Sequence, residues 1–496
     1  MPTAKQNYKV ASATKGVDYA QFASWSSAKA TEVIAIPCLD YEIPPQPQPK
    51  YPASAITVPD DILYKIFLVG FSNHPRTFGR LVSHVCRRWR RVALDSPILW
   101  SQLVFDRDGS DTFEHERLCL GRSYGAPLDV EISGKAFAES EDVHTRMRKV
   151  MQLIEPHAGR WKSLKLSNIP ENAFIVLGDR LTHLAIPNLE TLTVSHRSWK
   201  PRNANWKFRP FLSTGAPRLK NLTLRSVPFE WDSSLLYNLH KLTLDVLGLT
   251  WSDRVFVATK VYTLLSQSPE LMELVVSSMG GFMGSPARGG LHATEAAWPI
   301  PAPLAGVPSI CRPKLTKLFI ESAQVIDTIL QSVQMPALKA LPVKYRMSPS
   351  MAPFLTQYNG LSGLTELNID SGCVLKPEGT PVHKQHIAML SDLLLALPSV
   401  EQLGFQNIQF GAGVEDEKWF GSLAERCPKL KRLTLQSCGG LTERGICDVV
   451  SRRKAAQDME SLEVLWVMQC QNLTSMTEEC AAWLTTNVDR FAWSGR

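Results

Sequence analysis

The sequence predicts an α/β chain in which a small three-helix module is followed by a long array of strand and helix units. Two observations predict it: apolar residues recur at helical spacing between Thr57 and Trp100, and a short leucine phrase returns ten times after residue 160. At 496 residues the chain is longer than one ordinary core needs, so several domains or a repeat array are expected. Its composition, 44% apolar and 20% charged, is typical of a folded soluble protein.

Residues 1–54 are polar, then rich in proline ("EIPPQPQPKYP"), and have no sustained period of 3.6 or 2. This composition predicts a flexible leader that ends in a polyproline-like stretch. A proline-docking motif is the alternative function for the same residues.

Residues 55–105 carry the helical module. In "TVPDDILYKIFLVG" a cap-competent Thr57 precedes Pro59, and Ile62, Leu63, Ile66 and Phe67 follow at helical spacing, which predicts a capped helix. After the turn signal "SNHPRT" a second run places Phe78, Leu81, Val82, Val85, Trp89 and Val92 on one stripe.

The stretch "SHVCRRWRRVAL" sets four arginines around Trp89. A nucleic-acid patch would need the indole free for base stacking, but Trp89 falls on the apolar stripe and the arginines fall mostly off it. We therefore interpret the arginines as a solvated rim around a packed face, and expect no nucleic-acid partner.

The repeated phrase is a leucine, two variable residues, a leucine, one variable residue and an aliphatic or aromatic residue. It begins at Leu189, Leu219, Leu239, Leu271, Leu315, Leu338, Leu364, Val400, Leu430 and Leu462. Alternate residues of a short strand would point inward, and the first leucine would pack where the chain enters the strand. The phrase resembles that of leucine-rich repeats, which implies a horseshoe-shaped solenoid over residues 161–496.

The array is irregular. Successive phrases start 30 residues apart at Val400 and Leu430 but 44 apart at Leu271 and Leu315. A Gly/Pro-rich stretch near 279–313 predicts a projecting loop or a disordered insertion, and residues 106–160 are interpreted as a connecting segment.

Catalytic signals are absent from the sequence: it has no phosphate-binding glycine loop, no GxSxG elbow and no HExxH helix. Its 11 histidines are scattered and its ten cysteines form no C-x-x-C pair, so we predict no catalytic residue, no metal site and no cofactor. A net charge of +7 is weak over this length, and no apolar run could cross a membrane. We expect a cytoplasmic or nuclear protein without a membrane partner.

The helical module resembles an F-box. The resemblance rests on Pro59-Asp60-Asp61-Ile62-Leu63, Ile66-Phe67, Val85-Cys86-Arg87-Arg88-Trp89 and Pro97-Ile98-Leu99-Trp100, which occur in the family's order and spacing. Val58 replaces the usual leucine, and the loop with His74 and Pro75 is long for the family.

An F-box followed by leucine-rich repeats is similar to the substrate receptors of SCF-type ubiquitin ligases. The resemblance implies a non-catalytic subunit whose F-box docks on a Skp-type adaptor, and through it on a cullin, while the repeats hold a protein substrate. It places eight residues at or just beneath the surface that contacts the adaptor: Pro59, Ile62, Leu63, Ile66, Phe67, Val85, Trp89 and Trp100.

Two alternatives stay open: a leucine-rich-repeat scaffold without a role in ubiquitination, and a helical segment that only caps the open end of the array. The substrate is not readable from the sequence. Several variable positions of the phrases are basic, which favours an acidic or phosphorylated partner, and the candidate contacts are Lys220, Lys241, Lys317, Lys431 and Arg432.

Overall fold

The computed structural model divides into residues 1–58 and residues 59–496. It describes residues 58–106, 112–137, 142–196, 216–227, 229–245, 254–277, 308–321, 323–344, 363–370, 393–395, 397–408, 425–470 and 476–494, with the single residues 390, 410, 420, 423 and 473. The predicted leader and the predicted cap Thr57 lie outside these residues.

The helical module consists of α2 (Asp60–Asn73), α3 (Phe78–Ser83), α4 (Arg87–Leu94) and the 3-10 turn η3 (Pro97–Trp100). Helix α2 begins directly after Pro59, which makes no side-chain cap but whose carbonyl accepts the Leu63 N–H at 2.9 Å. Proline suits this position because its φ is fixed near the helical value.

The prediction of one continuous second stripe was wrong. Between α3 and α4 the chain leaves the helix, and Cys86 begins α4 by accepting the Trp89 N–H on its sulfur at 3.4 Å. Within α3 Val82 is buried and Leu81 faces outward, and Val85, in the break between the two helices, is exposed as well.

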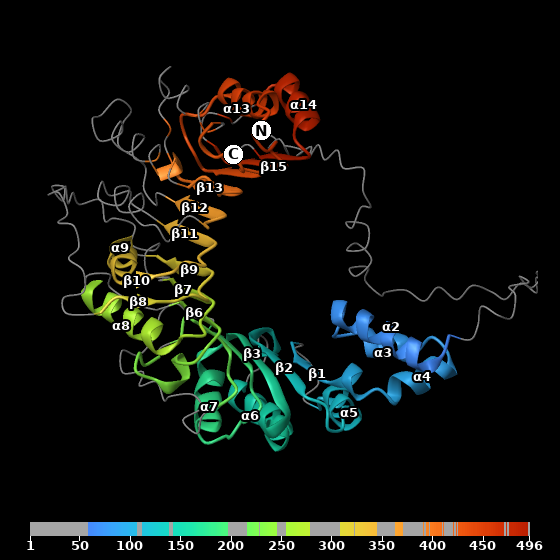
Figure 1. Cartoon of the computed structure of the whole chain (residues 1–496). Coiled ribbons are helices and arrows are strands. Elements are labelled where there is room, and N and C mark those ends of the chain that lie inside the picture. The colour runs from blue at the N-terminus through green and yellow to red at the C-terminus, as the bar shows by residue number, and fades with distance from the viewer. Residues whose placement is uncertain are drawn as a thin grey trace, which may run out of the picture. The chain divides into compact units, whose positions relative to one another are not determined.

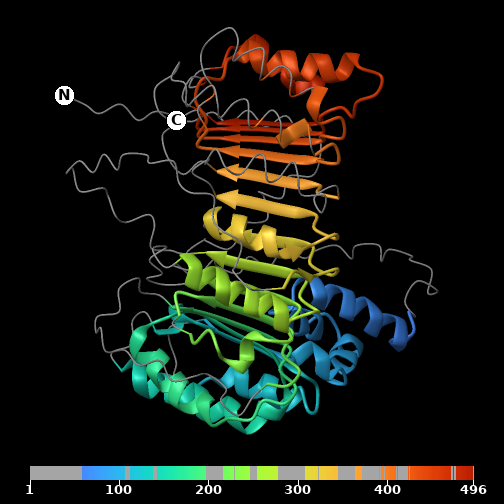
Figure 2. The same ribbon diagram turned by 60° about the vertical axis from the view of Figure 1, so that its left-hand side comes forward.

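In the part of the chain that the structure describes, fourteen parallel strands form one sheet. They follow one another in chain order (Figures 1 and 2). They are β1 (Gln102–Phe105), β2 (Leu128–Ser133), β3 (Trp161–Ile169), β4 (Thr191–His196), β5 (Asn221–Arg225), β6 (Lys241–Asp245), β7 (Glu273–Ser277), β9 (Lys317–Ile320), β11 (Ala340–Lys344), β12 (Glu366–Asp370), β13 (Gln402–Gln406), β14 (Arg432–Gln436), β15 (Val464–Met468) and β16 (Arg490–Ser494). Such an order is that of a solenoid, in which each unit pairs with its neighbours.

The ten leucine phrases coincide with ten of these strands, β4 to β7, β9 and β11 to β15. Each strand begins two residues after the first residue of its phrase, and all ten first residues are buried. The register aligns equivalent positions, for example Leu192 with Leu222 and Leu222 with Leu242, so the inward leucines form continuous rows. These rows are the core of the array.

Four strands were not predicted. Three of them carry the same spacing with other residues in the leucine places. Trp100 lies two residues before β1, Trp161 is the first residue of β3, and Val488 lies two residues before β16, where Phe491 replaces the second leucine; these three first residues are buried. In β1, for example, Leu103 and Phe105 take the two inward places. The segment 106–160, interpreted as a connection, adds β2 to the same sheet, paired with β1 and β3.

The helices that cover the sheet lie on one side of it (Figure 1). They are α6 (Val143–Ile154), α7 (Glu171–Thr182), α8 (Arg254–Gln267), α9 (Ala323–Ser332), α13 (Glu443–Ala455) and α14 (Glu478–Asn487). Helix α5 (Glu114–Arg122) packs beside β1 and η3, and short 3-10 turns span Gly134–Phe137 (η4), Glu155–Arg160 (η5) and Ser234–Leu236 (η6).

Residues 279–307 of the predicted insertion lie outside the described residues. Its last part is ordinary secondary structure: β8 (Ile310–Cys311) pairs in parallel with β10 (Val333–Gln334) in a separate two-stranded sheet. The Arg312 guanidinium anchors it by donating to the carbonyls of Leu265 and Ser266 at the end of α8.

Candidate functional site

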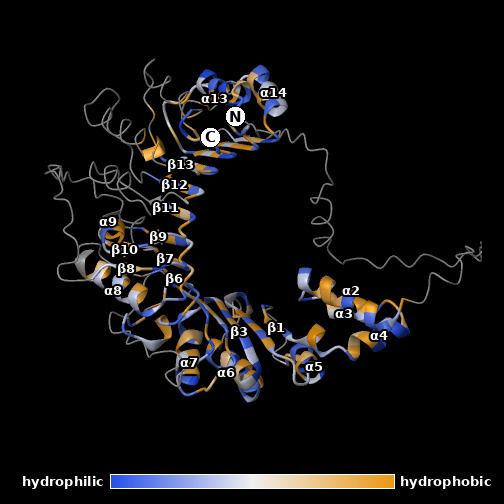
Figure 3. Ribbon diagram, in the orientation of Figure 1, coloured by the Kyte–Doolittle hydropathy of each residue, from blue (hydrophilic) through white to orange (hydrophobic). Residues whose placement is uncertain are grey.

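Helix α2 has a buried face and an exposed apolar face. Leu63 and Phe67 point into the module, and Phe67 is fully buried. Ile62, Ile66 and Val69 are 40%, 49% and 65% exposed, and their i, i+4, i+7 spacing places them on one side of the helix. Figure 3 shows hydrophobic residues, in orange, along α2. Leaving three branched apolar side chains in water on one helix face is typical of a protein-binding surface.

A second exposed apolar pair lies on and just after α3. Leu81 is 56% exposed and Val85 is 59% exposed. We call Ile62, Ile66 and Val69 the α2 strip, and Leu81 with Val85 the α3 strip.

Phe67 holds the core of the module together. Its ring meets Phe78 of α3 at 6.2 Å and Trp89 of α4 at 5.1 Å between centroids, both edge-on. Such geometry adds to the burial energy of the rings. Trp100 is buried as well and donates its indole N–H to the Ala93 carbonyl at 2.8 Å.

The structure therefore separates the eight residues proposed for adaptor contact. Pro59, Ile62, Ile66 and Val85 are exposed. Leu63, Phe67 and Trp100 are buried, and Trp89 is half-buried. A direct contact is open to the first four, whereas truncation of the buried three would disturb the core of the module.

The arginines around Trp89 have contacts inside the module. Asp60, at the start of α2, accepts from Arg88 at 2.7 Å and from Arg91 at 2.9 Å. The hydrogen bond from Arg88, followed by that from Arg91, lowers the pKa of the Asp60 carboxyl. Arg90 donates its Nε to the Ser83 carbonyl at 2.8 Å. These contacts join α4 to α2 and α3.

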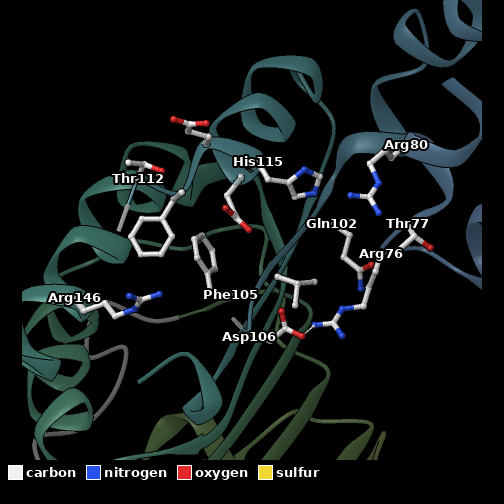
Figure 4. A pocket seen from close by; sticks show the side chains of 13 residues that line it. Arg76, Thr77, Arg80, Gln102, Phe105, Asp106, Thr112, His115 and Arg146 are labelled. Atoms are coloured by element: carbon white, nitrogen blue, oxygen red, sulfur yellow. Dashed lines mark hydrogen bonds and ion pairs between the residues drawn. The ribbon is translucent and has the colours of Figure 1, made fainter. Parts of the chain in front are cut away.

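A hollow of about 490 Å³ lies where the module meets β1 and α5 (Figure 4). It is lined by Arg76, Thr77, Arg80, Gln102, Val104, Phe105, Asp106, Thr112, Phe113, Glu114, His115, Glu116 and Arg146. Arg76 and Asp106 form an ion pair at 2.6 Å across it, and the Arg146 guanidinium lies 5.5 Å from the ring of Phe113. The three arginines of this hollow are balanced by three carboxylates, so it favours neither an anionic nor a cationic ligand.

The five basic residues proposed for substrate contact lie where the chain enters strands β5, β6, β9 and β14. Lys241 forms an ion pair with Glu273 of the next strand at 2.7 Å, and Lys431 lies 3.8 Å from Glu401. Lys317 stands in register with Glu273 as well. Glutamates therefore lie next to several of these lysines, and this mixture of charges weakens the argument for an acidic partner.

The sequence did not point to two side chains on the last strands, Trp466 and Arg490. Trp466 of β15 is 45% exposed between Thr434 and Ala492 of the neighbouring strands, and Arg490 begins β16. Trp466 occupies the variable position of the phrase "LEVLWV", and strand alternation alone would have placed it on the outward face.

Within the described ranges, no group of histidine, cysteine and carboxylate side chains could hold a metal ion. Nor does the described part of the chain contain a helix of the length and apolarity needed to span a membrane.

Comparison with known families agrees with the geometry of the module. Residues 56–106 match the F-box-like family. No curated protein matches the chain significantly. The chain thus carries an F-box-like domain, a kind of domain that binds Skp-type adaptors and belongs generally to non-catalytic substrate receptors.

Proposed function

We propose that the protein is the substrate-recognition subunit of an SCF-type E3 ubiquitin ligase. Its F-box-like domain would bind a Skp-type adaptor and, through it, a cullin, while the strand array acts as leucine-rich repeats that hold a protein substrate. The chain itself would supply no catalytic group and would act by raising the local concentration of substrate lysines near the ubiquitin-conjugating enzyme.

The observation that carries this proposal is the exposed α2 strip on a domain of the F-box-like family. Ile62, Ile66 and Val69 are available to a partner while Leu63 and Phe67 of the same helix maintain the core. A helix that buries one apolar face and exposes another can place the exposed face in an apolar groove of a partner.

The test compares the full chain with an Ile62→Glu/Ile66→Glu variant in a titration with a purified Skp-type adaptor. Both side chains are exposed, so the fold should survive, and adaptor affinity should fall at least about tenfold, or 1.4 kcal/mol. Ile175→Glu on α7, also exposed, is the matched control and should bind normally. Wild-type affinity in the double variant would contradict the proposed surface.

Ubiquitin transfer in a reconstituted ligase separates a receptor from a scaffold. If the adaptor binds but no transfer to captured substrate occurs, the alternative of a scaffold outside ubiquitination gains support.

A capping role for the module is favoured by one observation. Strand β1 belongs to the matched residues and pairs with β2 along its whole length. Deletion of residues 57–105 should then lower the melting temperature of the array, and an unchanged melting temperature would exclude this role.

A further inference from the structure

A second hollow shares Arg80 and His115 with the first and differs from it in charge. Its volume is about 330 Å³. It is lined by Arg80, Ser83, His84, Arg90, Leu94, Trp100, His115, Leu118, Cys119 and Arg122. His84 directly follows α3 and the others come from α3, α4, η3 and α5, so the hollow lies between the F-box-like domain and the first unit of the array.

The lining holds three guanidinium groups and two imidazoles but no carboxylate. The carboxylates of this region, Asp106, Glu114 and Glu116, line the larger hollow instead. Within the described residues, no carboxylate lies at ion-pair distance from Arg80, Arg90 or Arg122. The described residues thus supply no counter-charge to these three arginines, and a bound anion would offset their mutual repulsion.

Two of the three guanidinium groups are held in place by the protein. Arg90 is fixed by the hydrogen bond from its Nε to the Ser83 carbonyl, which leaves its terminal nitrogens to other acceptors. Arg122 stacks on the buried Trp100 with its Cζ 4.4 Å from the ring centroid. A stacked guanidinium keeps its in-plane N–H groups available, and its fork matches two oxygens of a phosphate.

We propose that this hollow binds a small soluble anion that bears two or more phosphate groups. Its volume falls at the lower end of the range for small-molecule sites and exceeds what a single phosphate fills. The lining also includes the buried Trp100 and the partly buried Leu94, whose apolar surface would strengthen the contacts of the anion with the arginines. The inference does not depend on the adaptor or on ubiquitin transfer.

Calorimetric titration of the full chain with inorganic tripolyphosphate tests the proposal. At about 0.1 M salt, where weak surface binding is screened, saturable one-to-one binding is expected. Arg80→Gln and Arg122→Gln should each weaken it roughly tenfold, since each removes a charge-assisted contact. Arg87→Gln is the matched control, because Arg87 is an exposed arginine of α4 that does not line the hollow, and its affinity should equal that of the wild type.

Equal loss of affinity in all three variants would show unspecific attraction to a basic surface and would overturn the proposal, as would no binding at all. Vesicles that contain a phosphoinositide distinguish the source of the phosphates. Binding to vesicles without binding to soluble tripolyphosphate would assign the hollow to a lipid surface and overturn the soluble ligand. A singly phosphorylated peptide that binds while tripolyphosphate does not would also overturn it.

Discussion

Arg453 of α13 is a charged side chain that the array buries almost completely, with 1% exposed. Its guanidinium donates to the carbonyls of Cys427, Pro428, Leu430 and Glu460 at 2.7 to 3.1 Å. Burial lowers the pKa of this guanidinium. Arg453 therefore links the loop before β14 to the loop before β15 through their backbone carbonyls.

Arg453→Met should therefore lower the free energy of unfolding by about 3 kcal/mol or more, because several buried carbonyls lose a charged donor at once. Arg452→Met is the control on the same helix: its ion pairs with Asp448 and Glu425 are solvent-exposed and should contribute under about 1 kcal/mol. Urea unfolding of both variants measures the difference. Equal losses would show that the carbonyl cluster contributes little.

Asp60 makes the stability of the F-box-like domain dependent on pH. Its pKa is lowered below 3.8 in the folded state, so its ion pairs with Arg88 and Arg91 stabilise above that pH and are lost as the pH falls through the folded pKa. Asp60→Asn should lower the melting temperature at neutral pH, and the difference from the wild type should shrink toward acid pH. Asp61→Asn removes a carboxylate at the same helix end but neither of these ion pairs, so it should lower the melting temperature at neutral pH by less. A difference that stays constant with pH would contradict this.

At the scale of elements, α2 and α3 pack closely at a glycine. A Cβ on Gly70 would lie 2.0 Å from the ring of Phe78, which itself contacts Phe67. The two helices could not keep this approach with any larger residue.

Gly70→Ala should destabilise the domain and weaken adaptor binding, although alanine is normally the better helix former by about 1 kcal/mol. Gly178→Ala in α7 is the counterpart, because a Cβ there meets nothing within 4 Å, and it should raise stability. Thermal melts of both variants show whether each substitution lowers or raises the melting temperature. A stabilising Gly70→Ala would show that Phe78 moves aside freely.

The helices of this domain mark the limit of sequence reasoning. The spacing of Ile62, Leu63, Ile66 and Phe67 predicted α2 but not which pair faces the core, because both pairs are apolar. The choice depends on Phe78 and Trp89, which α3 and α4 bring to Phe67. Likewise the spacing did not predict the break before the Cys86 cap, where Val85 is exposed, or that α3 buries Val82 and leaves Leu81 outside.

For the whole molecule, the phrase predicted ten strands of the sheet because its first leucine fills a place that every unit repeats. The same place holds Trp100 and Trp161 at β1 and β3, and a search restricted to aliphatic residues could not find them. The hollow with three arginines could not be predicted either, since Arg80, Arg90 and Arg122 come from three helices whose packing creates it.

Trp100 ends η3, and β1 begins two residues later at Gln102, so the helical domain passes directly into the sheet. Because no linker separates the helical domain from the sheet, the distance between the proposed adaptor surface and the proposed substrate surface would be fixed. Each added unit would move a substrate site by one strand spacing, about 4.8 Å, relative to the adaptor. The number of units, rather than a flexible tether, would then decide which substrate lysines come within reach.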